Sequence, residues 1–399
     1  MNGIGLLKNI VKEYSWGSYT AIPALLGKKP PYHKPQAELW MGAHPSGSSM
    51  IKTENGWESL YSLIRRYPDE ILGKSCAKKF GGELPFLFKV IAASEPLSIQ
   101  AHPNRTLAKK GFTRENRQGI SPGSSIRNYR DDKHKPELVC ALTDFKALCG
   151  FRKIPDILNL FKKVCPGSLG KAIYALENNP DSSGLKMFIS CLMELGDERK
   201  KKVISEADRN VRSFTCDEPA FGCVARLIES HPTDIGVLSP LYLNLVSLSP
   251  GQAVFLPSGQ LHAYLGGTAL ELMADSDNVV RGGLTQKHID PVELLKIVNF
   301  RSHRVNMILP VKNRKEYVYK TSAREFTLSK IIIDTCSTYA GPQRRNAEII
   351  LCIKGRAVIT GAEGNRLNLS RGKSVIVPAS EKYYRIDGNA TLYKAQTPF

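Results

Sequence analysis

The chain lacks two features that would assign it to a membrane or a secreted class. No apolar run in its 399 residues approaches the ~20 that a helix needs to cross a bilayer. The apolar stretch near the N-terminus is too short and too poorly flanked for a secretion signal. Its nine cysteines are odd in number, scattered and without a C-x-x-C pair, which argues against a disulfide framework. We therefore expect a cytoplasmic protein without a membrane partner.

Acidic residues are fewer than basic ones. There are 37 Asp and Glu against 56 Lys and Arg, and the formal net charge is +19. Such a surplus is typical of nucleic-acid-binding proteins. Here, however, the basic residues are spread along the chain, and no zinc-finger, helix-turn-helix or RNP motif accompanies them. We predict no nucleic-acid partner and interpret the charge as surface composition that attracts small anions.

The most informative segment is residues 250–267, PGQAVFLPSGQLHAYLGG. Gly251 suits a turn, and the three apolar residues from Ala253 form a short strand. Pro257 ends that strand, and Gly259 turns the chain so that His262 faces inward. This spacing resembles the second signature motif of the cupin superfamily of β-barrels, in which the histidine binds a metal.

Three further residues upstream have the chemistry of metal ligands. Gln100 and His102 are two positions apart, so on a strand their side chains leave the same face. Glu137 opens the apolar run of residues 138–142. Together with His262 they form a nitrogen and oxygen set that suits Zn²⁺ and leaves room for water or substrate. The alternative interpretation is a buried amide at Gln100 and a strand-end carboxylate at Glu137.

A series of segments then resembles one family within the cupins. In order along the chain they read YSWGS at 14–18, AELWMGAHP at 37–45, LPFLFKV at 84–90, QAHPN at 100–104, HKPE at 134–137 and LELMADSDNVVRGGLT at 270–285. This series is similar to the signatures of type I phosphomannose isomerases. The resemblance implies one Zn²⁺ per chain, held by Gln100, His102, Glu137 and His262. It also implies a catalytic role for Arg281.

The resemblance implies an enzyme that interconverts mannose 6-phosphate and fructose 6-phosphate through an enediol(ate). The planar, permanently charged guanidinium of Arg281 suits either the enediolate or the phosphate. Lys135 is a candidate proton-transfer group, with a structural salt bridge as the alternative. Glu271 and Asp277 are two candidate catalytic carboxylates, between which the sequence does not decide. As candidate substrate contacts we name Lys89, Ser98, Trp16, Tyr264 and His134.

The periodicity of apolar residues divides the chain into three parts. Residues 1–150 alternate short strands with turns and contain one expected helix, which ends before Pro68. Residues 151–235 carry three apolar stripes at helical spacing, and strands return at 241–246. We predict a mainly β protein with two cupin-type barrels (jelly rolls) and an all-helical insertion domain. The metal-binding barrel comprises 1–150 and 236–305, the insertion 151–235, and the second barrel 306–399.

The second barrel is predicted to lack a metal. Glu348 and Gly355, and Gly372 and Pro378, repeat the spacings of the cupin motifs. The histidines are missing from this repeat: residues 344–346 are Arg-Arg-Asn, and 383–384 are Tyr-Tyr. We expect this barrel to pack against the catalytic one, in a protein that we predict to be a monomer.

Two other functional classes are alternatives for this sequence. A different metal-dependent cupin, such as an epimerase or a dioxygenase, is disfavoured by Gln100 and by the segment around Arg281, since iron oxygenases favour two histidines and one carboxylate. A sugar-sensing cupin without activity would be signalled by loss of the metal ligands or of Arg281. Both are present.

Overall fold

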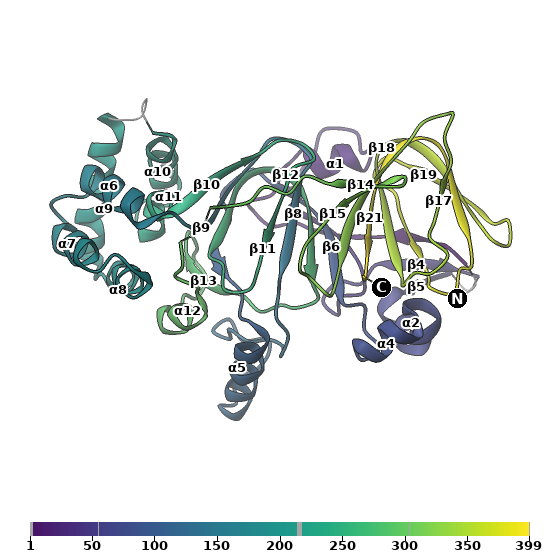
Figure 1. The fold of residues 1–399 in the computed structure, drawn as a ribbon, viewed down its shortest axis with the longest axis horizontal. Helices are drawn as coiled ribbons and strands as arrows, with labels where there is room; N and C mark the ends of the chain where they lie inside the picture. Colours follow the sequence, from purple (N-terminus) through teal and green to yellow (C-terminus); the bar gives the residue numbers. More distant parts are fainter. Residues whose placement is uncertain (1–2, 55, 214–217, 303, 399) are drawn as a thin grey trace.

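The structure is a computed structural model that describes residues 3–54, 56–213, 218–302 and 304–398. The strands of this part of the chain form two antiparallel sheets. Figure 1 shows them side by side, with a group of helices at one end of the molecule and both termini near the other. The prediction of a mainly β protein is confirmed.

The first sheet carries the predicted ligands. Its main path runs β10-β9-β12-β6-β3-β2, and β7, β8, β11 and β13 pair alongside. The long strand β12 is central, since it pairs with β6, β7, β8 and β9. The strands are β2 (Ile10–Lys12), β3 (Glu38–Met41), β6 (Phe86–Ala93), β7 (Ile99–Ala101), β8 (Glu137–Ala141), β9 (Phe145–Phe151), β10 (Leu243–Leu248), β11 (Ala253–Leu256), β12 (His262–Ala274) and β13 (Val280–Gly283).

The second sheet joins the two ends of the chain. Its path runs β14-β15-β16-β21-β18-β20-β1-β4-β5, with β17 on β21 and β19 on β18. Three N-terminal strands therefore extend a sheet built mostly after residue 310, an association that sequence periodicity does not reveal. The strands are β1 (Gly5–Lys8), β4 (Met50–Thr53), β5 (Gly56–Ser59), β14 (Val311–Asn313), β15 (Glu316–Tyr319), β16 (Thr327–Ile333), β17 (Tyr339–Ala340), β18 (Glu348–Gly361), β19 (Arg366–Ser370), β20 (Ser374–Val377) and β21 (Tyr384–Gln396).

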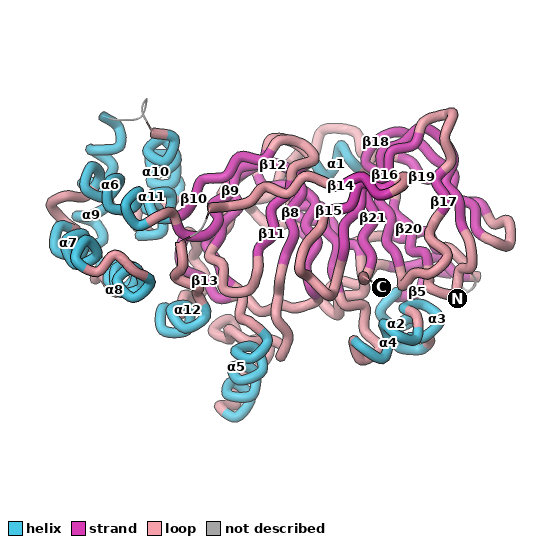
Figure 2. The backbone as a smooth tube through the Cα atoms, in the orientation of Figure 1, coloured by secondary structure: helices cyan, strands magenta, loops and turns pink. Residues whose placement is uncertain are grey.

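Five helices follow one another directly after β9, within residues 154–230. They are α6 (Ile154–Val164), α7 (Gly170–Asn178), α8 (Ser182–Met193), α9 (Asp197–Ser213) and α10 (Pro219–Ser230). The three apolar stripes of the sequence lie on α6, α8 and α10. Their buried residues form one core that continues into strand residues such as Leu148 and Val280. Figure 2 shows these helices gathered at the end of the first sheet.

The expectation of a single helix in residues 1–150 was wrong. This region holds α1 (Ala21–Leu25), α2 (Leu60–Arg66), α3 (Pro68–Leu72), α4 (Lys74–Lys79) and α5 (Arg105–Arg117). Three of these have only five or six residues. Helix α5 buries only Ala108, Gly111 and Glu115, so it shows no apolar stripe. The remaining helices are a 3₁₀ turn (Ile235–Leu238), α11 (Ser239–Tyr242) and α12 (Pro291–Ile297).

The two sheets repeat one local arrangement. Glu137 of β8 lies opposite Leu256, the residue before Pro257, and Glu348 of β18 lies opposite Val377, the residue before Pro378. On the other side Glu137 faces Met273 and Glu348 faces Gln396. By this register, Lys394 of β21 takes the place that Glu271 holds on β12.

In the second sheet a buried cluster of charges surrounds that lysine. The ammonium of Lys394 lies 2.7 Å from Glu316 Oε1 and 3.1 Å from Glu348 Oε1, and it donates to the hydroxyl of Tyr339 at 3.1 Å. Tyr384 donates to the other oxygen of Glu348 at 2.6 Å. The lysine side chain and both oxygens of Glu348 are shielded from solvent.

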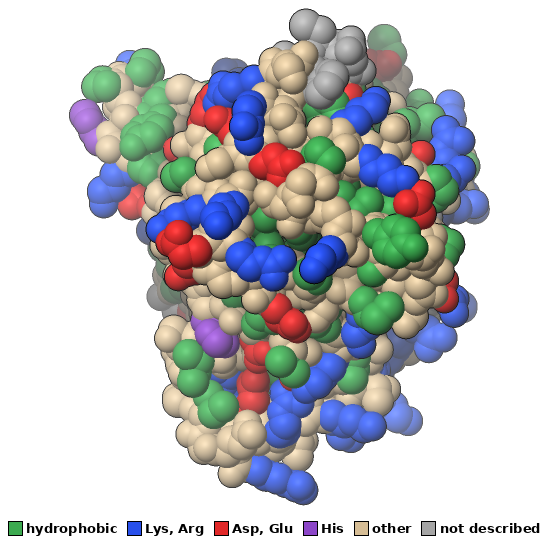
Figure 3. Space-filling model, turned by 90° about the vertical axis from the view of Figure 1, so that its left-hand side faces the viewer, with side chains coloured by type: hydrophobic (Ala, Val, Ile, Leu, Met, Phe, Trp, Pro, Cys, Tyr) green, Lys and Arg blue, Asp and Glu red, His purple; other side chains and the backbone are tan. Residues whose placement is uncertain are grey.

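Surface charge is dispersed on the face that Figure 3 shows. Lys and Arg side chains there are interspersed with acidic and apolar ones and do not merge into one continuous patch. No helix in the described ranges is long and apolar enough to cross a membrane.

Candidate metal centre

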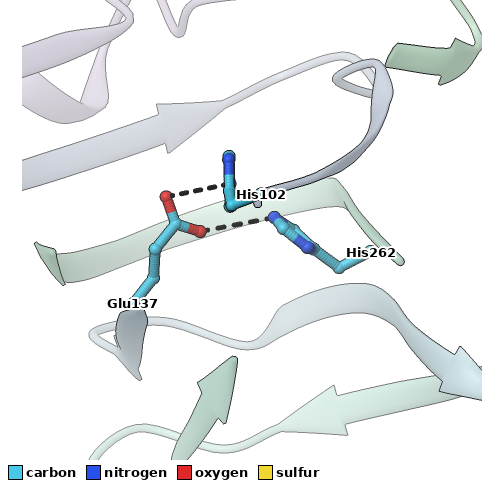
Figure 4. A group of neighbouring side chains, drawn as sticks. All are labelled: His102, Glu137 and His262. Atoms are coloured by element: carbon cyan, nitrogen blue, oxygen red, sulfur yellow. Dashed lines mark ion pairs between the residues drawn. The ribbon is translucent and has the colours of Figure 1, made fainter. Parts of the chain in front are cut away.

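Three buried side chains converge where strands of the first sheet begin or end. Glu137 is the first residue of β8, His262 is the first of β12, and His102 follows directly after β7. Nε2 of His102 lies 3.3 Å from Glu137 Oε1, and Nε2 of His262 lies 3.3 Å from Glu137 Oε2. Figure 4 shows both imidazoles directed at the two oxygens of the carboxylate. The three residues thus offer two nitrogens and a carboxylate to one point.

Hydrogen bonds fix the direction of both imidazoles. Nδ1 of His102 lies 2.7 Å from the carbonyl oxygen of Asn278, and Nδ1 of His262 lies 2.9 Å from that of Gln260. A carbonyl only accepts, so each Nδ1 carries the proton and each Nε2 presents a lone pair. These two Nε2 atoms and Oε2 of Glu137 are buried without a hydrogen-bond partner. Such orphaned atoms are costly unless a ligand satisfies them, and this donor set fits Zn²⁺.

The protonation states also suit a metal. Burial lowers the pKa of His102 to about 4, which leaves the imidazole neutral at pH 7. Burial would raise the pKa of Glu137, but His102 and Lys135 hold it well below its usual value. A neutral imidazole and an ionised carboxylate are the forms that bind metals.

The turn glycine of the motif brings two ligand segments together. Gly259 has φ +82°, as its place in the turn predicts, and its N–H donates to the carbonyl of His102 at 2.7 Å. A Cβ at this position would lie 2.8 Å from the carbonyl oxygen of Ile297. A side chain here would therefore be strained and would push the Gly259 turn away from the segment of Ile297 and Asn299.

Gln100 is placed by the register of three strands. It lies opposite His262 of β12 and opposite Arg281 of β13. Cross-strand partners share a face of the sheet. This strand register places Gln100 between His262 and Arg281, as expected for a fourth metal ligand. Its role as that ligand stays a prediction.

A second set of predicted residues forms a buried network beside the cluster. Lys89 Nζ lies 3.0 Å from Glu271 Oε2, and Tyr264 donates to Glu271 Oε1 at 2.8 Å. Burial alone would lower the pKa of Lys89, but Glu271 and Glu38 raise it above its ordinary value, so the lysine stays charged. A second lysine lies close by: Lys135 Nζ is 3.2 Å from Glu137 Oε1. Lys89, Lys135 and the phenol of Tyr264 are thus held in fixed positions near the proposed ligands.

Three cations gather on the Arg281 side. Burial and then Arg130 lower the pKa of Arg281. Burial, Arg281 and Arg130 lower that of Lys287. Mutual effects of this kind require the three groups to be close, and no ion pair of the described residues involves any of them. They form a region rich in positive charge beside Gln100, with Asp277 near Arg130 and Glu38 near Lys287.

The other predicted residues lie around these groups. Asp277 Oδ1 is 3.4 Å from Nε2 of His44, and His134 Nε2 is 2.8 Å from Glu325 Oε1. Trp16 packs against the apolar cluster that contains Tyr264. Ser98 directly precedes β7. Their roles toward a substrate stay predictions.

Sequence reasoning did not single out Asn278, Glu325 or His44. Asn278 and His44 lie inside the quoted segments, but amides and lone histidines have no characteristic periodicity. Glu325 is more than 180 residues from its partner His134, so no local pattern could have linked them.

Comparison with known proteins identifies the family. Residues 5–154 match the model of the type I phosphomannose isomerase catalytic domain, and 315–396 match the mannose-6-phosphate isomerase cupin domain. The mannose-6-phosphate isomerase of Salmonella typhimurium is 40% identical over 389 residues, which cover 97% of each chain. This chain belongs to the type I phosphomannose isomerase family. Among other phosphomannose isomerases, the human protein is 32% identical and aligns with 93% of this chain and 92% of its own.

Solved structures of the phosphomannose isomerase family have the same fold. A crystal structure of the Salmonella typhimurium enzyme bound to its substrate, fructose 6-phosphate, and to zinc has a TM-score of 0.92 and 38% identity, and covers 99% of this chain and 100% of that one. A zinc-bound mannose 6-phosphate isomerase has a TM-score of 0.91 at the same identity and coverage.

Proposed function

We propose that this chain is a zinc-dependent mannose-6-phosphate isomerase, which moves a proton between C1 and C2 of the sugar phosphate. The observation that carries the proposal is the buried group of His102, Glu137 and His262, with two bare imidazole nitrogens and one carboxylate oxygen unsatisfied. It stands in a chain whose relatives of nearly equal length bear this name. Gln100 completes the proposed ligand set.

The residues around the centre supply what the reaction needs. Bound zinc polarises and orients the sugar oxygens. Lys89 and Tyr264, both fixed by Glu271, present a cation and a phenol to the hydroxyls. Lys135 is our candidate for proton transfer, because it is a buried amine whose Nζ lies 3.2 Å from Glu137 Oε1, beside the proposed metal.

The cluster of Arg130, Arg281 and Lys287 is our candidate site for the phosphate dianion. None of the three forms an ion pair among the described residues, and a dianion would stabilise all three. We expect Asp277, Ser98, Trp16 and His134 to line the same site.

We also propose that the two sheets are closed cupin barrels. The matching register of Glu137 and Glu348 supports two related units, and the shared core of α6 to α10 supports a helical insertion at 151–235. The pairing of β1, β4 and β5 with the second sheet ties the N-terminal segment to the 306–399 unit. A monomeric state and a cytoplasmic location stay predictions.

A coupled assay of mannose 6-phosphate conversion tests the function. Purified protein treated with a chelator should lose nearly all turnover, because the Lewis acid is removed, and stoichiometric Zn²⁺ should restore it. Full turnover in metal-free protein, or none in the zinc-loaded protein, would reject the proposal.

Arg281→Lys should reduce kcat/KM by about 10²-fold, if the guanidinium acts like a donor to developing charge. Lysine keeps the charge but loses the planar fork that binds two oxygens. Zinc content and melting temperature should stay near the parent values, since the ligands are untouched. Steady-state kinetics and elemental analysis of one preparation measure both, with Arg356→Lys on the exposed part of β18 as control. Parental kinetics would remove Arg281 from the mechanism, and loss of zinc would make it structural.

A further inference from the structure

Asn278 occupies the loop between β12 and β13, three residues before Arg281. Its solvent exposure is 0%, although it lies in a loop and carries a polar side chain. A buried amide is stable only when its donors and acceptor are satisfied. The partners of Asn278 therefore indicate why it is there.

The backbone of Asn278 acts on a proposed metal ligand. Its carbonyl oxygen lies 2.7 Å from Nδ1 of His102. This bond holds the proton on Nδ1 and directs Nε2 toward Glu137. Bonds of this kind, from the second nitrogen of a ligand histidine, set its tautomer and orientation.

The side chain of Asn278 holds a second segment of the site. Oδ1 accepts from the backbone N–H of Arg130 at 2.7 Å and of Asp131 at 3.2 Å. Nδ2 donates to the carbonyls of Asp131 at 2.9 Å and Lys133 at 2.8 Å, and to Asp131 Oδ1 at 3.1 Å. One amide thus fixes the backbone of residues 130–133 on both its donor and its acceptor side.

The segment that it holds leads directly into the reacting groups. Arg130 belongs to the cation cluster, and two residues after Lys133 comes Lys135, followed by Glu137. Asp131 also accepts from the N–H of Asp277 and the hydroxyl of Ser276, both at 2.8 Å, so further bonds beside those of Asn278 join the two loops. A shift of Asn278 would therefore change the orientation of His102 and displace the 130–133 segment.

We infer that Asn278 is a positioning residue of this metal centre, which couples the orientation of His102 to the placement of Arg130 and Lys135. The expected effects on kinetics rest on the proposed function. The expected effect on zinc affinity does not depend on the reaction. Loss of the side-chain bonds should loosen the loop and with it the carbonyl that holds His102.

The test compares Asn278→Ala with Asn346→Ala. Asn346 is a matched control, because it is also buried and its amide also donates to backbone carbonyls, those of Thr397 and Pro398, neither of which pairs with a proposed ligand. Zinc affinity is measured by competition with a chelator, alongside kcat, KM for mannose 6-phosphate and melting temperature. Asn278→Asp serves as a second variant that keeps the volume and one acceptor but replaces the donors.

We expect both Asn278 variants to bind zinc about 10- to 100-fold more weakly, as for other partners of ligand histidines, with lower kcat and higher KM. Asn346→Ala should lose stability but keep parental zinc affinity and kinetics. Parental zinc affinity in the Asn278 variants, or the same weakening in Asn346→Ala, would overturn the inference. An inactive parent that binds zinc would reject the proposed function instead, and the zinc comparison would still decide the role of Asn278.

Discussion

Replacing His262 with alanine is expected to abolish metal binding and to reduce turnover by about 10³-fold or more. The change removes one of the two nitrogens and leaves Glu137 facing a single imidazole. Several kcal/mol of electrostatic stabilisation disappear with the metal, and each 1.36 kcal/mol corresponds to a factor of ten in rate. Elemental analysis and the coupled assay on the same preparation measure the two losses.

Stability should respond to zinc in the parent but not in the variant. A ligand that binds only the folded state raises the melting temperature of the parent, so added zinc should shift the parent and leave His262→Ala unchanged. His33→Ala, at an exposed histidine, is the control and should behave as the parent. Full zinc content in His262→Ala would place the metal elsewhere.

The motif that contains His262 was predictable because its information is local. Turn glycines, a strand-ending proline and a histidine at fixed spacing specify Gly251, Gly259 and His262 within twelve residues, and the two glycines have the positive φ that the turns require. The resemblance to phosphomannose isomerases added the partners, Gln100, His102 and Glu137. The strand register then brings them together, since Gln100 faces His262 and Glu137 lies within reach of both imidazoles.

What the sequence did not reveal depends on distant partners. Strand β1 pairs with β20, more than 300 residues away, and β4 and β5 extend the sheet beyond β1. Helix α5 is mostly exposed, so its apolar periodicity is weak. The role of Asn278 is recognisable only from its hydrogen bonds to His102 and to the 130–133 segment. An asparagine in the sequence does not reveal which groups its amide will bind.

The buried lysine of the second sheet gives the largest expected effect on stability. Lys394→Met keeps most of the apolar stem of the side chain but removes the ammonium between Glu316 and Glu348. Removal of one partner from a buried ion pair usually costs about 3–5 kcal/mol, because the other charge is left uncompensated. The free energy of unfolding, from urea denaturation of metal-free protein, should fall by that amount, and the exposed Lys382→Met should change it little.

A second substitution separates lost charge from lost packing. Glu348→Gln added to Lys394→Met removes the uncompensated carboxylate, and we expect it to recover part of the loss. If the double variant is as unstable as the sum of the single variants, the two residues do not act as a pair.

The pH dependence follows from the same cluster. Burial would lower the pKa of Lys394, but Glu348, Tyr339 and Glu316 raise it above its ordinary value. A raised pKa means that the stabilisation is complete below the unfolded pKa and is lost only as pH rises through the folded one. The deficit of Lys394→Met should therefore be full at pH 7 and should not respond to zinc or chelator. Register places Lys394 where Glu271 stands in the first sheet, and its ammonium neutralises Glu348, the counterpart of Glu137. A deficit that zinc reverses would show that this sheet, too, takes a metal.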